Sequence, residues 1–527
     1  MAARISRRQA LVAGGGAAAA VVGVPFGLGL RSGGEASSAT LLRSGRPLPA
    51  AFQVPLEIPR VLTPNRGSVP GADHYELTQR QAEVEVLPGV RTAIWGYDGT
   101  FPGSTIHARS GRPVVVRHTN LLPVPTVTHL HAGQTPSASD GFPTDLLLPS
   151  PSTAARNSMA ASMSMDGMGG NDPHASVVQT SRDYTYPLQQ RAAMLWYHDH
   201  RMDFTAPSVW RGLAGMFIVH DAEEEALELP AGERDIPLMI ADRSFGGDGE
   251  LIYPSSYPSL IRPGVRAAYA AGVLGDVALV NGRPWPFLEV DAARYRFRIL
   301  NASNARRYRL TLDPRLGQAP FIQVGTDGGL LDAPLGHAAI EIAPAQRYDV
   351  VVDFSACRPG ERITLRNGFG TGRMEQVMQF RIARKAHDDS RVPIRLSHPP
   401  VPDPARSART RSFVFRRSGG HGWTINGETF SPTEALISPR AGSTEIWEFV
   451  SDFHHPIHVH LASMRVLNRG LNGPGEFDHG LKDVLDLRPA ERIRVAITFG
   501  EYPGRYVLHC HNLEHEDMGM MATFRLV

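Results

Sequence analysis

The sequence predicts an all-β protein that consists of three successive β-sandwich domains. A chain of 527 residues is too long for one hydrophobic core and indicates about three or four domains. Short runs rich in β-branched and aromatic residues, such as RPVVVRHTN, RYRFRILNA and TEIWEFVSD, recur along it with turns on either side. The 52 glycines and 42 prolines fit many short strands that are joined by turns.

One sequence plan occurs three times, which is the third reason for this prediction. The segments GYDGTFPGSTIHARSGRPVVVRHTN, VNGRPWPFLEVDAARYRFRILNAS and INGETFSPTEALISPRAGSTEIWEFV share it. Each has a turn with glycine, an aromatic residue or proline, a stretch of bulky and acidic residues, another turn and a strand. We interpret them as three diverged copies of one β-sandwich.

Composition sets the expected boundaries. Domain 1 is expected at residues 50–222, domain 2 at 232–385 and domain 3 at 411–527, with a Pro/Arg/Ser-rich connector at 386–410. Domain 2 lacks the histidine motifs described below. Its expected role is therefore spacing and packing, which places domains 1 and 3 against each other.

The N-terminal residues 1–45 are expected to form an export signal and leader. The pair Arg7-Arg8 precedes an Ala/Gly-rich apolar run that ends at about Leu30, a pattern that resembles a twin-arginine (Tat) signal. A membrane anchor is the alternative, but the run is short and rich in glycine. Cleavage near Ala39 would leave a mature chain without a membrane span. The expected location is extracellular, periplasmic or in the cell envelope.

Charge and cysteine content exclude a nucleic-acid-binding arm and a disulfide framework. The net charge is +2, without the long basic block of a nucleic-acid-binding arm. The chain has two cysteines, so one disulfide is the maximum. We expect Cys357 to be a small buried apolar residue. Cys510 lies in a motif that suggests a different role.

The C-terminal segment HCHNLEHEDMGM, residues 509–520, carries potential metal ligands. Two His and one Cys with a weak axial Met form the arrangement that suits a blue copper centre. Cys510, His515 and Met520 can supply three of these four ligands. Because side chains alternate along a strand, His509 and His511 would face away from that copper and towards a second site.

Three other segments contain His-x-His pairs, namely HLH, HDH and HPIHVH. The two rings of each pair lie on one strand face, about 6.8 Å apart along the chain, which suits two adjacent metals. A single pair is explained as well by two packed or surface histidines, but four clusters favour metal binding. They hold ten of the 21 histidines. These are His129, His131, His198, His200, His455, His458, His460, His509, His511 and His515.

With these motifs, the sequence resembles three-domain multicopper oxidases. It is most similar to the bacterial branch that contains spore-coat laccases, bilirubin oxidases and phenoxazinone synthases, from about Phe52 to the C-terminus. HLH, WYHDH, HPIHVH and HCHNLEHEDMGMM are highly specific as a set, and GDVALVNGRPWPFLEV and DIPLMIADRSF also match that branch. The resemblance implies that the three sandwiches are cupredoxin-like Greek-key domains.

The resemblance also implies four copper ions and their ligands. The expected type 1 ligands are His455, Cys510, His515 and axial Met520. The expected type 2 ligands are His129 and His458. The expected type 3 ligands are His131, His198, His200, His460, His509 and His511. Met518 and Met521 are alternatives for the axial position. His454 could replace His455, but Pro456 matches the family pattern after His455.

Two acids match proton-relay positions of that branch, namely Asp140 and Glu516. The alternatives are an ordinary Asp-Gly turn for Asp140 and a partner that orients a ligand histidine for Glu516. One departure from the family pattern is Ala132, where glycine is usual. We expect the turn to shift to Gly133, because alanine would be strained at positive φ.

The expected function is laccase-like. Phenols or aromatic amines would give single electrons to the type 1 copper, and Cys510 would pass them on for reduction of dioxygen to water. The donor is expected to bind near His515 or His455, where ring edges reach solvent. Bilirubin oxidase-like or phenoxazinone synthase-like substrates are alternatives, and a non-enzymatic cupredoxin scaffold is the least favoured one.

A Met-rich loop at residues 157–170 supports a second alternative, a metallo-oxidase that oxidises Cu(I) in copper tolerance. Met159, Met163, Met165 and Met168 offer soft sulfur ligands for Cu(I). A low-complexity surface insertion without a role is the slightly favoured interpretation of this loop.

Overall fold

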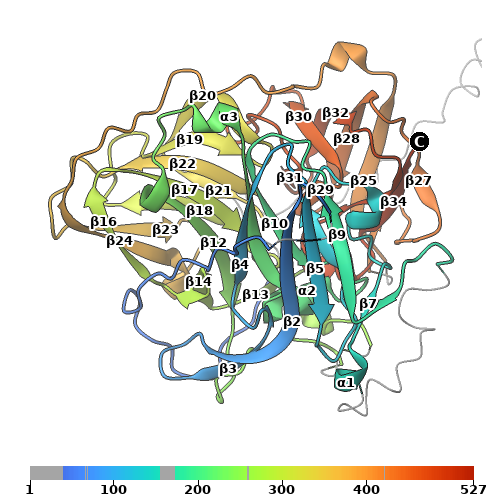
Figure 1. Ribbon diagram of the computed structural model, residues 1–527, viewed down its shortest axis with the longest axis horizontal. Coiled ribbons are helices and arrows are strands. Elements are labelled where there is room, and N and C mark those ends of the chain that lie inside the picture. Colours follow the sequence, from blue (N-terminus) through green and yellow to red (C-terminus); the bar gives the residue numbers. More distant parts are fainter. Residues whose placement is uncertain are drawn as a thin grey trace, which may run out of the picture. The chain divides into compact units, whose positions relative to one another are not determined.

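The computed structural model describes residues 39–65, 67, 69–154, 172–257, 260, 262–419 and 422–527. The predicted all-β class is confirmed, because six sheets of four to seven strands form three sandwiches in chain order (Figure 1). The expected Tat signal and Met-rich loop lie outside the described residues. None of the described helices is long and apolar enough to cross a membrane.

Domain 1 pairs two four-stranded sheets around a core of aromatic and aliphatic side chains. One sheet contains β2 (Asp73–Glu85), β3 (Arg91–Tyr97), β5 (Val114–Asn120) and β9 (Ser181–Tyr186). The other contains β4 (Gly103–Arg109), β6 (Thr128–His131), β10 (Ala193–Asp199) and β11 (Ala214–His220). The second sheet carries the first two His-x-His motifs.

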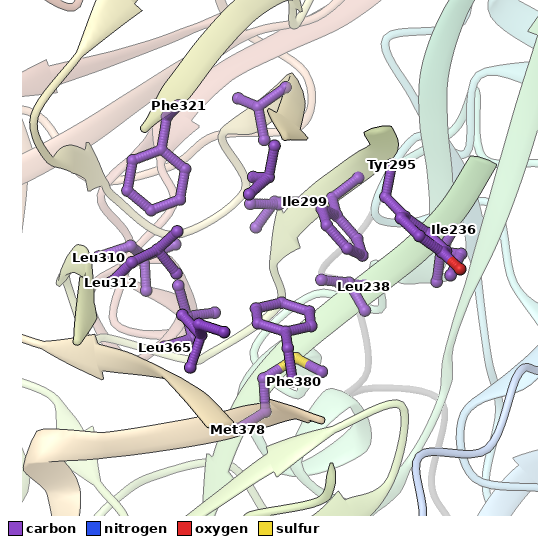
Figure 2. Close-up of a cluster of buried hydrophobic side chains, with 14 of the residues drawn as sticks. Ile236, Leu238, Tyr295, Ile299, Leu310, Leu312, Phe321, Leu365, Met378 and Phe380 are labelled. Carbon is purple, nitrogen blue, oxygen red and sulfur yellow. The ribbon is translucent and has the colours of Figure 1, made fainter. Parts of the chain in front are cut away.

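Domain 2 pairs a seven-stranded with a five-stranded sheet. The larger sheet contains β12 (Asp235–Arg243), β14 (Val277–Val280), β15 (Arg283–Pro284), β17 (Arg294–Asn301), β19 (Phe321–Thr326), β20 (Gly329–His337) and β22 (Arg347–Asp353). The smaller contains β16 (Phe287–Ala292), β18 (Tyr308–Asp313), β21 (Ile340–Ile342), β23 (Arg362–Asn367) and β24 (Gln376–Lys385). Figure 2 shows Phe321, Ile299, Leu365 and Phe380 among the side chains that gather between these sheets.

Domain 3 pairs two five-stranded sheets, and its strands are orange to red in Figure 1. One contains β25 (Thr410–Ser418), β26 (Gly422–Ile425), β28 (Thr444–Ser451), β30 (Ala462–Arg469) and β32 (Arg492–Phe499). The other contains β27 (Ala435–Ile437), β29 (His455–Val459), β31 (Val484–Leu487), β33 (Gly504–Cys510) and β34 (Met521–Leu526). β29 and β33 are neighbours and carry the remaining histidine motifs.

Short elements complete the fold. In the described part of the chain, the α-helices are α1 (Pro151–Ala154), α2 (Thr205–Arg211), α3 (Ala222–Glu225) and α4 (Leu513–Asp517). A two-stranded sheet joins β7 (Leu147–Leu148) to β8 (Val178–Gln179), and another joins β1 (Thr40–Leu41) to β13 (Val273–Leu274). Residues 40 and 41, which the sequence placed in the leader, therefore pair with a strand of domain 2.

Candidate metal centre

Eight histidines from domains 1 and 3 meet in one buried cluster, here called the three-metal site after the number of copper ions that the resemblance implies for it: His129, His131, His198, His200, His458, His460, His509 and His511. The antiparallel pairing of β6 with β10 sets His129 opposite His198, and that of β29 with β33 sets His458 opposite His509. Each of the eight residues is at most 1% exposed. Strand pairing thus brings all four motifs to the contact of the two domains.

The two rings of each His-x-His pair lie on one side of the strand, as alternation predicts. Their centroids are 5.8 Å apart for His129 and His131 and 5.7 Å apart for His198 and His200. In domain 3 the separations are 4.9 Å for the β29 pair and 5.5 Å for the rings that flank Cys510. One strand therefore offers rings to two neighbouring positions.

The histidines form three triads, and within each triad the three ligand atoms lie within 4.8 Å of one another. They are His129/His131/His458, His131/His198/His511 and His200/His460/His509. Several inward nitrogens have no hydrogen-bond partner among the described residues: His129 Nε2, His131 Nδ1, His198 Nε2, His458 Nε2 and both nitrogens of His511. Buried polar atoms without partners are costly, and metal ions are suitable partners for imidazole lone pairs. The donor set fits copper.

The outer nitrogens of the rings are held by oxygen atoms. His129 Nδ1 donates to the Asp140 carbonyl oxygen at 2.5 Å, and His198 Nδ1 donates to that of Asp199 at 2.9 Å. His458 Nδ1 donates to the Asp483 carbonyl oxygen at 2.9 Å. An oxygen acceptor on one nitrogen fixes the tautomer and leaves the other nitrogen free to bind a metal.

Burial disfavours the protonated form of seven of these rings, because it lowers their pKa values. It lowers the pKa of His198 to about 3 and that of His200 to about 4. It also lowers the pKa of His129, His131, His458, His460 and His511 well below the usual value. Neutral imidazole is the form that binds metal, so protons do not compete for these ligands near neutral pH.

A second cluster, here called the sulfur site, comprises His455, Cys510 and His515, with Met520 buried in the same apolar cluster as Cys510. Cys510 Sγ lies 3.5 Å from His455 Nδ1 and 3.6 Å from His515 Nδ1, and the two Nδ1 atoms are 3.2 Å apart. Burial raises the pKa of the Cys510 thiol well above its usual value. A cation at this position would deprotonate the thiol, which is how metal ions bind cysteine.

The surroundings of the sulfur site distinguish its expected ligands from the alternatives Met518, Met521 and His454. Met520 is fully buried in the same apolar cluster as Cys510, whereas Met521 packs with Phe142 in another cluster. Met518 is only partly buried. His454 Nε2 donates to the Asp486 carboxylate and is not among the residues that converge on the thiol.

The prediction that ring edges of His455 or His515 reach solvent is wrong. His455 and His515 are both 0% exposed. Trp423 lies against His515, with ring centroids 3.7 Å apart. Trp423, itself buried, thus packs over the His515 ring, and His455 Nε2 donates to Asp452 Oδ1 at 3.0 Å.

Both predicted relay acids contact outer nitrogens of the three-metal site. His460 Nδ1 donates to Asp140 Oδ2 at 2.7 Å, and Glu516 Oε2 lies 3.0 Å from His509 Nδ1. Burial raises the pKa of Asp140 well above its usual value. Burial also opposes ionisation of Glu516, but the nearby imidazoles hold the pKa of this carboxyl far below its usual value.

Ala132 has φ of +71°, so the predicted shift of the turn to Gly133 is wrong. The residue follows His131 directly, and the left-handed conformation lets the chain leave β6 there. Strain of about 1–2 kcal/mol is the usual consequence for a residue with a Cβ atom.

Sequence reasoning missed Asp452, Trp423 and Asp483, which contact ligand histidines. Asp483 Oδ1 accepts a hydrogen bond from His131 Nε2 at 3.1 Å. The only sequence signal for Asp452 is its position three residues before His455. Asp483 and Trp423 approach the ligands through tertiary contacts that no motif encodes.

Comparison with known proteins agrees with this site. A family model described as multicopper oxidase matches residues 396–526, and a second matches residues 78–157 and 148–224. A laccase from Bacillus subtilis (strain 168) is 36% identical over 88% of this chain and 96% of its own length. A bilirubin oxidase from Albifimbria verrucaria is 34% identical over 90% of this chain and 81% of its own.

Solved structures agree as well. The crystal structure of a multi-copper oxidase from Pediococcus acidilactici has a TM-score of 0.78 at 28% identity and covers 93% of this chain and 94% of its own. The relatives, the matched models and the shared architecture show the same family, which establishes copper as the metal and an oxidoreductase as the class of enzyme. The chain belongs to the multicopper oxidase family.

Proposed function

We propose that this multicopper oxidase is laccase-like and couples one-electron oxidation of phenols or aromatic amines to four-electron reduction of dioxygen to water. The observation that carries the proposal is the position of Cys510. Its thiol faces His455 and His515, while the rings on either side of it belong to the three-metal site. Relatives named laccase and bilirubin oxidase support the same reaction class.

The proposal assigns four copper ions. The type 1 ion would be held by His455, Cys510, His515 and Met520. The type 2 ion would be held by His129 and His458, and the type 3 pair by His131, His198, His200, His460, His509 and His511. Bound copper would supply the redox chemistry, namely uptake of single electrons at the sulfur site and dioxygen reduction at the three-metal site.

The chain connects and encloses these sites. Cys510 joins them through its own main chain, since His509 and His511 are its direct neighbours. The backbone N–H of Asn512 donates to Cys510 Sγ at 3.4 Å and stabilises a thiolate there. Complete burial of both sites excludes bulk water and limits loss of partly reduced oxygen.

Asp140 and Glu516 have two roles in the proposal. Each contacts an outer ring nitrogen and therefore orients a ligand. They also form a proton relay, in which the Asp140 carboxyl holds a proton and the Glu516 carboxylate accepts one. Two acids whose pKa values are shifted in opposite directions are typical of acid–base pairs. Thr205 Oγ1 donates to Glu516 Oε1 at 2.7 Å and fixes this carboxylate.

Purified protein tests this function directly. We expect four copper ions per chain, a blue colour, and consumption of one dioxygen for every four one-electron donors oxidised. A panel of a phenol, an aminophenol, bilirubin and Cu(I) identifies the preferred donor. A fully metallated protein that consumes no dioxygen with any of them would contradict the proposal.

A metallo-oxidase role is the second candidate, favoured by the four methionines of the segment 157–170. These thioethers would bind an additional Cu(I) and feed it to the sulfur site. Deletion of residues 157–170 separates the candidates. A decrease confined to Cu(I) turnover supports the metallo-oxidase, and unchanged Cu(I) turnover excludes this role of the segment.

Export by the Tat machinery is part of the proposal, because Arg7 and Arg8 precede an apolar run. Delivery to the extracellular space, periplasm or cell envelope follows from it. Replacement of both arginines by lysine should retain the protein in the cytoplasm. Unchanged export of this variant would contradict the assignment.

A further inference from the structure

Four buried charges lie beside the three-metal site where domains 1, 2 and 3 meet. Asp327 and Arg347 belong to domain 2, and Lys482 and Asp483 belong to domain 3. Lys482 Nζ lies 3.3 Å from Asp327 Oδ2, and Arg347 forms an ion pair with Asp483. None of the four side chains is more than 5% exposed. Domain 2 therefore reaches the site although it carries none of the motif histidines.

Arg347, the first residue of β22, uses all five of its side-chain N–H donors. Nε donates to the Met194 carbonyl oxygen of domain 1 at 3.0 Å. Nη1 donates to the Ala345 carbonyl oxygen at 2.9 Å, and Nη2 to that of Asp327 at 3.1 Å. The remaining two donors bind both carboxylate oxygens of Asp483. One guanidinium group thus connects all three domains, and lysine, with three donors and no planar fork, cannot replace these contacts.

Asp483 in turn holds two rings of the three-metal site. Its Oδ1 accepts a hydrogen bond from His131 Nε2 at 3.1 Å, and its carbonyl oxygen accepts one from His458 Nδ1 at 2.9 Å. The two rings stack with centroids 3.7 Å apart and planes at 14°. Among the residues that the structure describes, His131 Nδ1 and His458 Nε2 are thereby left without hydrogen-bond partners, and the two rings belong to the same triad.

We propose that Arg347 of domain 2 is a positioning residue for the three-metal site, and that it acts through Asp483 on the imidazoles of His131 and His458. The proposal rests on the copper assignment above. The guanidinium fixes both oxygens of Asp483, so that Oδ1 is aimed at His131. Residues that hold a metal-binding histidine in this way tune metal affinity without touching the metal.

This role differs from simple packing between domains. A packing contact contributes to stability alone, whereas the chain from Arg347 to His131 sets which ring nitrogen faces the metal and in which direction. The sulfur site has no residue in this chain of contacts. Its blue absorption therefore serves as an internal reporter of correct folding.

Three variants test the proposal. Arg347→Lys keeps the charge but loses the fork, and Asp483→Asn keeps the shape but offers His131 one carbonyl oxygen in place of a carboxylate. Arg411→Lys is the matched control, because Arg411 forms a two-pronged ion pair with Glu445 at 2.6 and 2.9 Å within domain 3. Each protein is dialysed against increasing chelator. Copper per chain, the electron paramagnetic resonance signal of cupric ions outside the blue centre, the blue absorption and the unfolding midpoint are recorded.

We expect Arg347→Lys and Asp483→Asn to bind copper at the three-metal site about 10–100-fold more weakly. Copper is then lost at chelator concentrations that leave the blue absorption intact, and the resonance signal changes. Arg411→Lys should behave like the wild type in these measurements. If Arg347→Lys does not fold, Asp483→Asn decides the question alone.

Two results would overturn the proposal. One is wild-type copper retention and an unchanged resonance signal in Asp483→Asn and in any folded Arg347→Lys protein. The other is joint loss of copper from both sites, which indicates general destabilisation. Failure of the wild type to hold copper or to consume dioxygen would refute the proposed function instead.

Discussion

Replacement of Asp452 by asparagine removes a negative charge that lies one imidazole ring away from the sulfur site. His455 Nε2 donates to Asp452 Oδ1 at 3.0 Å. Burial opposes ionisation of Asp452, but the bond from His455 and backbone N–H donors hold the pKa of its carboxyl below the usual value. The carboxylate is therefore charged at neutral pH and favours the oxidised, more positive state of a metal bound to His455.

The size of the effect follows from the difference between a charged and a neutral acceptor. A hydrogen bond to a charged group contributes about 1.5–3 kcal/mol and a neutral one about 0.5–1.5 kcal/mol, so the change is about 1 kcal/mol. For a one-electron couple, where 59 mV corresponds to about 1.4 kcal/mol, this is about 40 mV. We expect Asp452→Asn to raise the reduction potential of the sulfur site by about 40 mV.

Redox titration of the blue absorption measures this shift. Glu448→Gln is a suitable control, because Glu448 is a partly exposed acid on β28 of the same domain and forms an ion pair with Arg492 at 3.7 Å. A downward shift, or a shift no larger than that of the control, would refute the reasoning. Such a result would mean that Asp452 does not influence the metal through His455.

Three further predictions concern turnover, access and acid stability. Glu516→Gln should lower dioxygen turnover about 100-fold and leave the blue absorption intact. Glu514→Gln should not lower turnover, and equal losses in the two variants would argue against a proton relay. We expect about 3–5 kcal/mol lower unfolding free energy for both Trp423→Ala and Trp447→Ala. Only Trp423→Ala should speed oxidation of bulky donors, because only Trp423 packs over His515. An equal change of this rate in both variants would contradict the covering role of Trp423. Burial lowers the pKa of histidines such as His118, to about 3, so the unfolded chain takes up protons that the native one does not. Between pH 6.5 and 5.5 the metal-free protein should lose about 1 kcal/mol of unfolding free energy for each such ring, and chemical denaturation that shows no loss would contradict this.

The sequence predicted those features of the site that depend on strand geometry. The period of two along a strand places His509 and His511 on one face and Cys510 on the other, and the structure has this arrangement. The all-β class was predictable for the same reason, since alternation and turn residues are local. Spacing along the chain also grouped Cys510 with His515 and Met520, whereas His455, 55 residues before Cys510, was expected there only from the resemblance to the family.

Other parts of the site could not be predicted, because they depend on how distant segments pack. Arg347 and Asp483 are 136 residues apart, and their pairing exists only where domain 2 meets domain 3. The cover of Trp423 over His515 is likewise a tertiary contact. Ala132 misled the prediction because alanine is rare at positive φ, and the surrounding structure holds it there.

Copper counting combined with visible absorption, on the wild type and on Cys510→Ser, tests the central claim most directly. We predict four copper ions and blue colour for the wild type. Cys510→Ser should lose the colour and one copper ion and keep the other three. A fully metallated wild type without colour, or a Cys510→Ser protein that stays blue, would contradict the account.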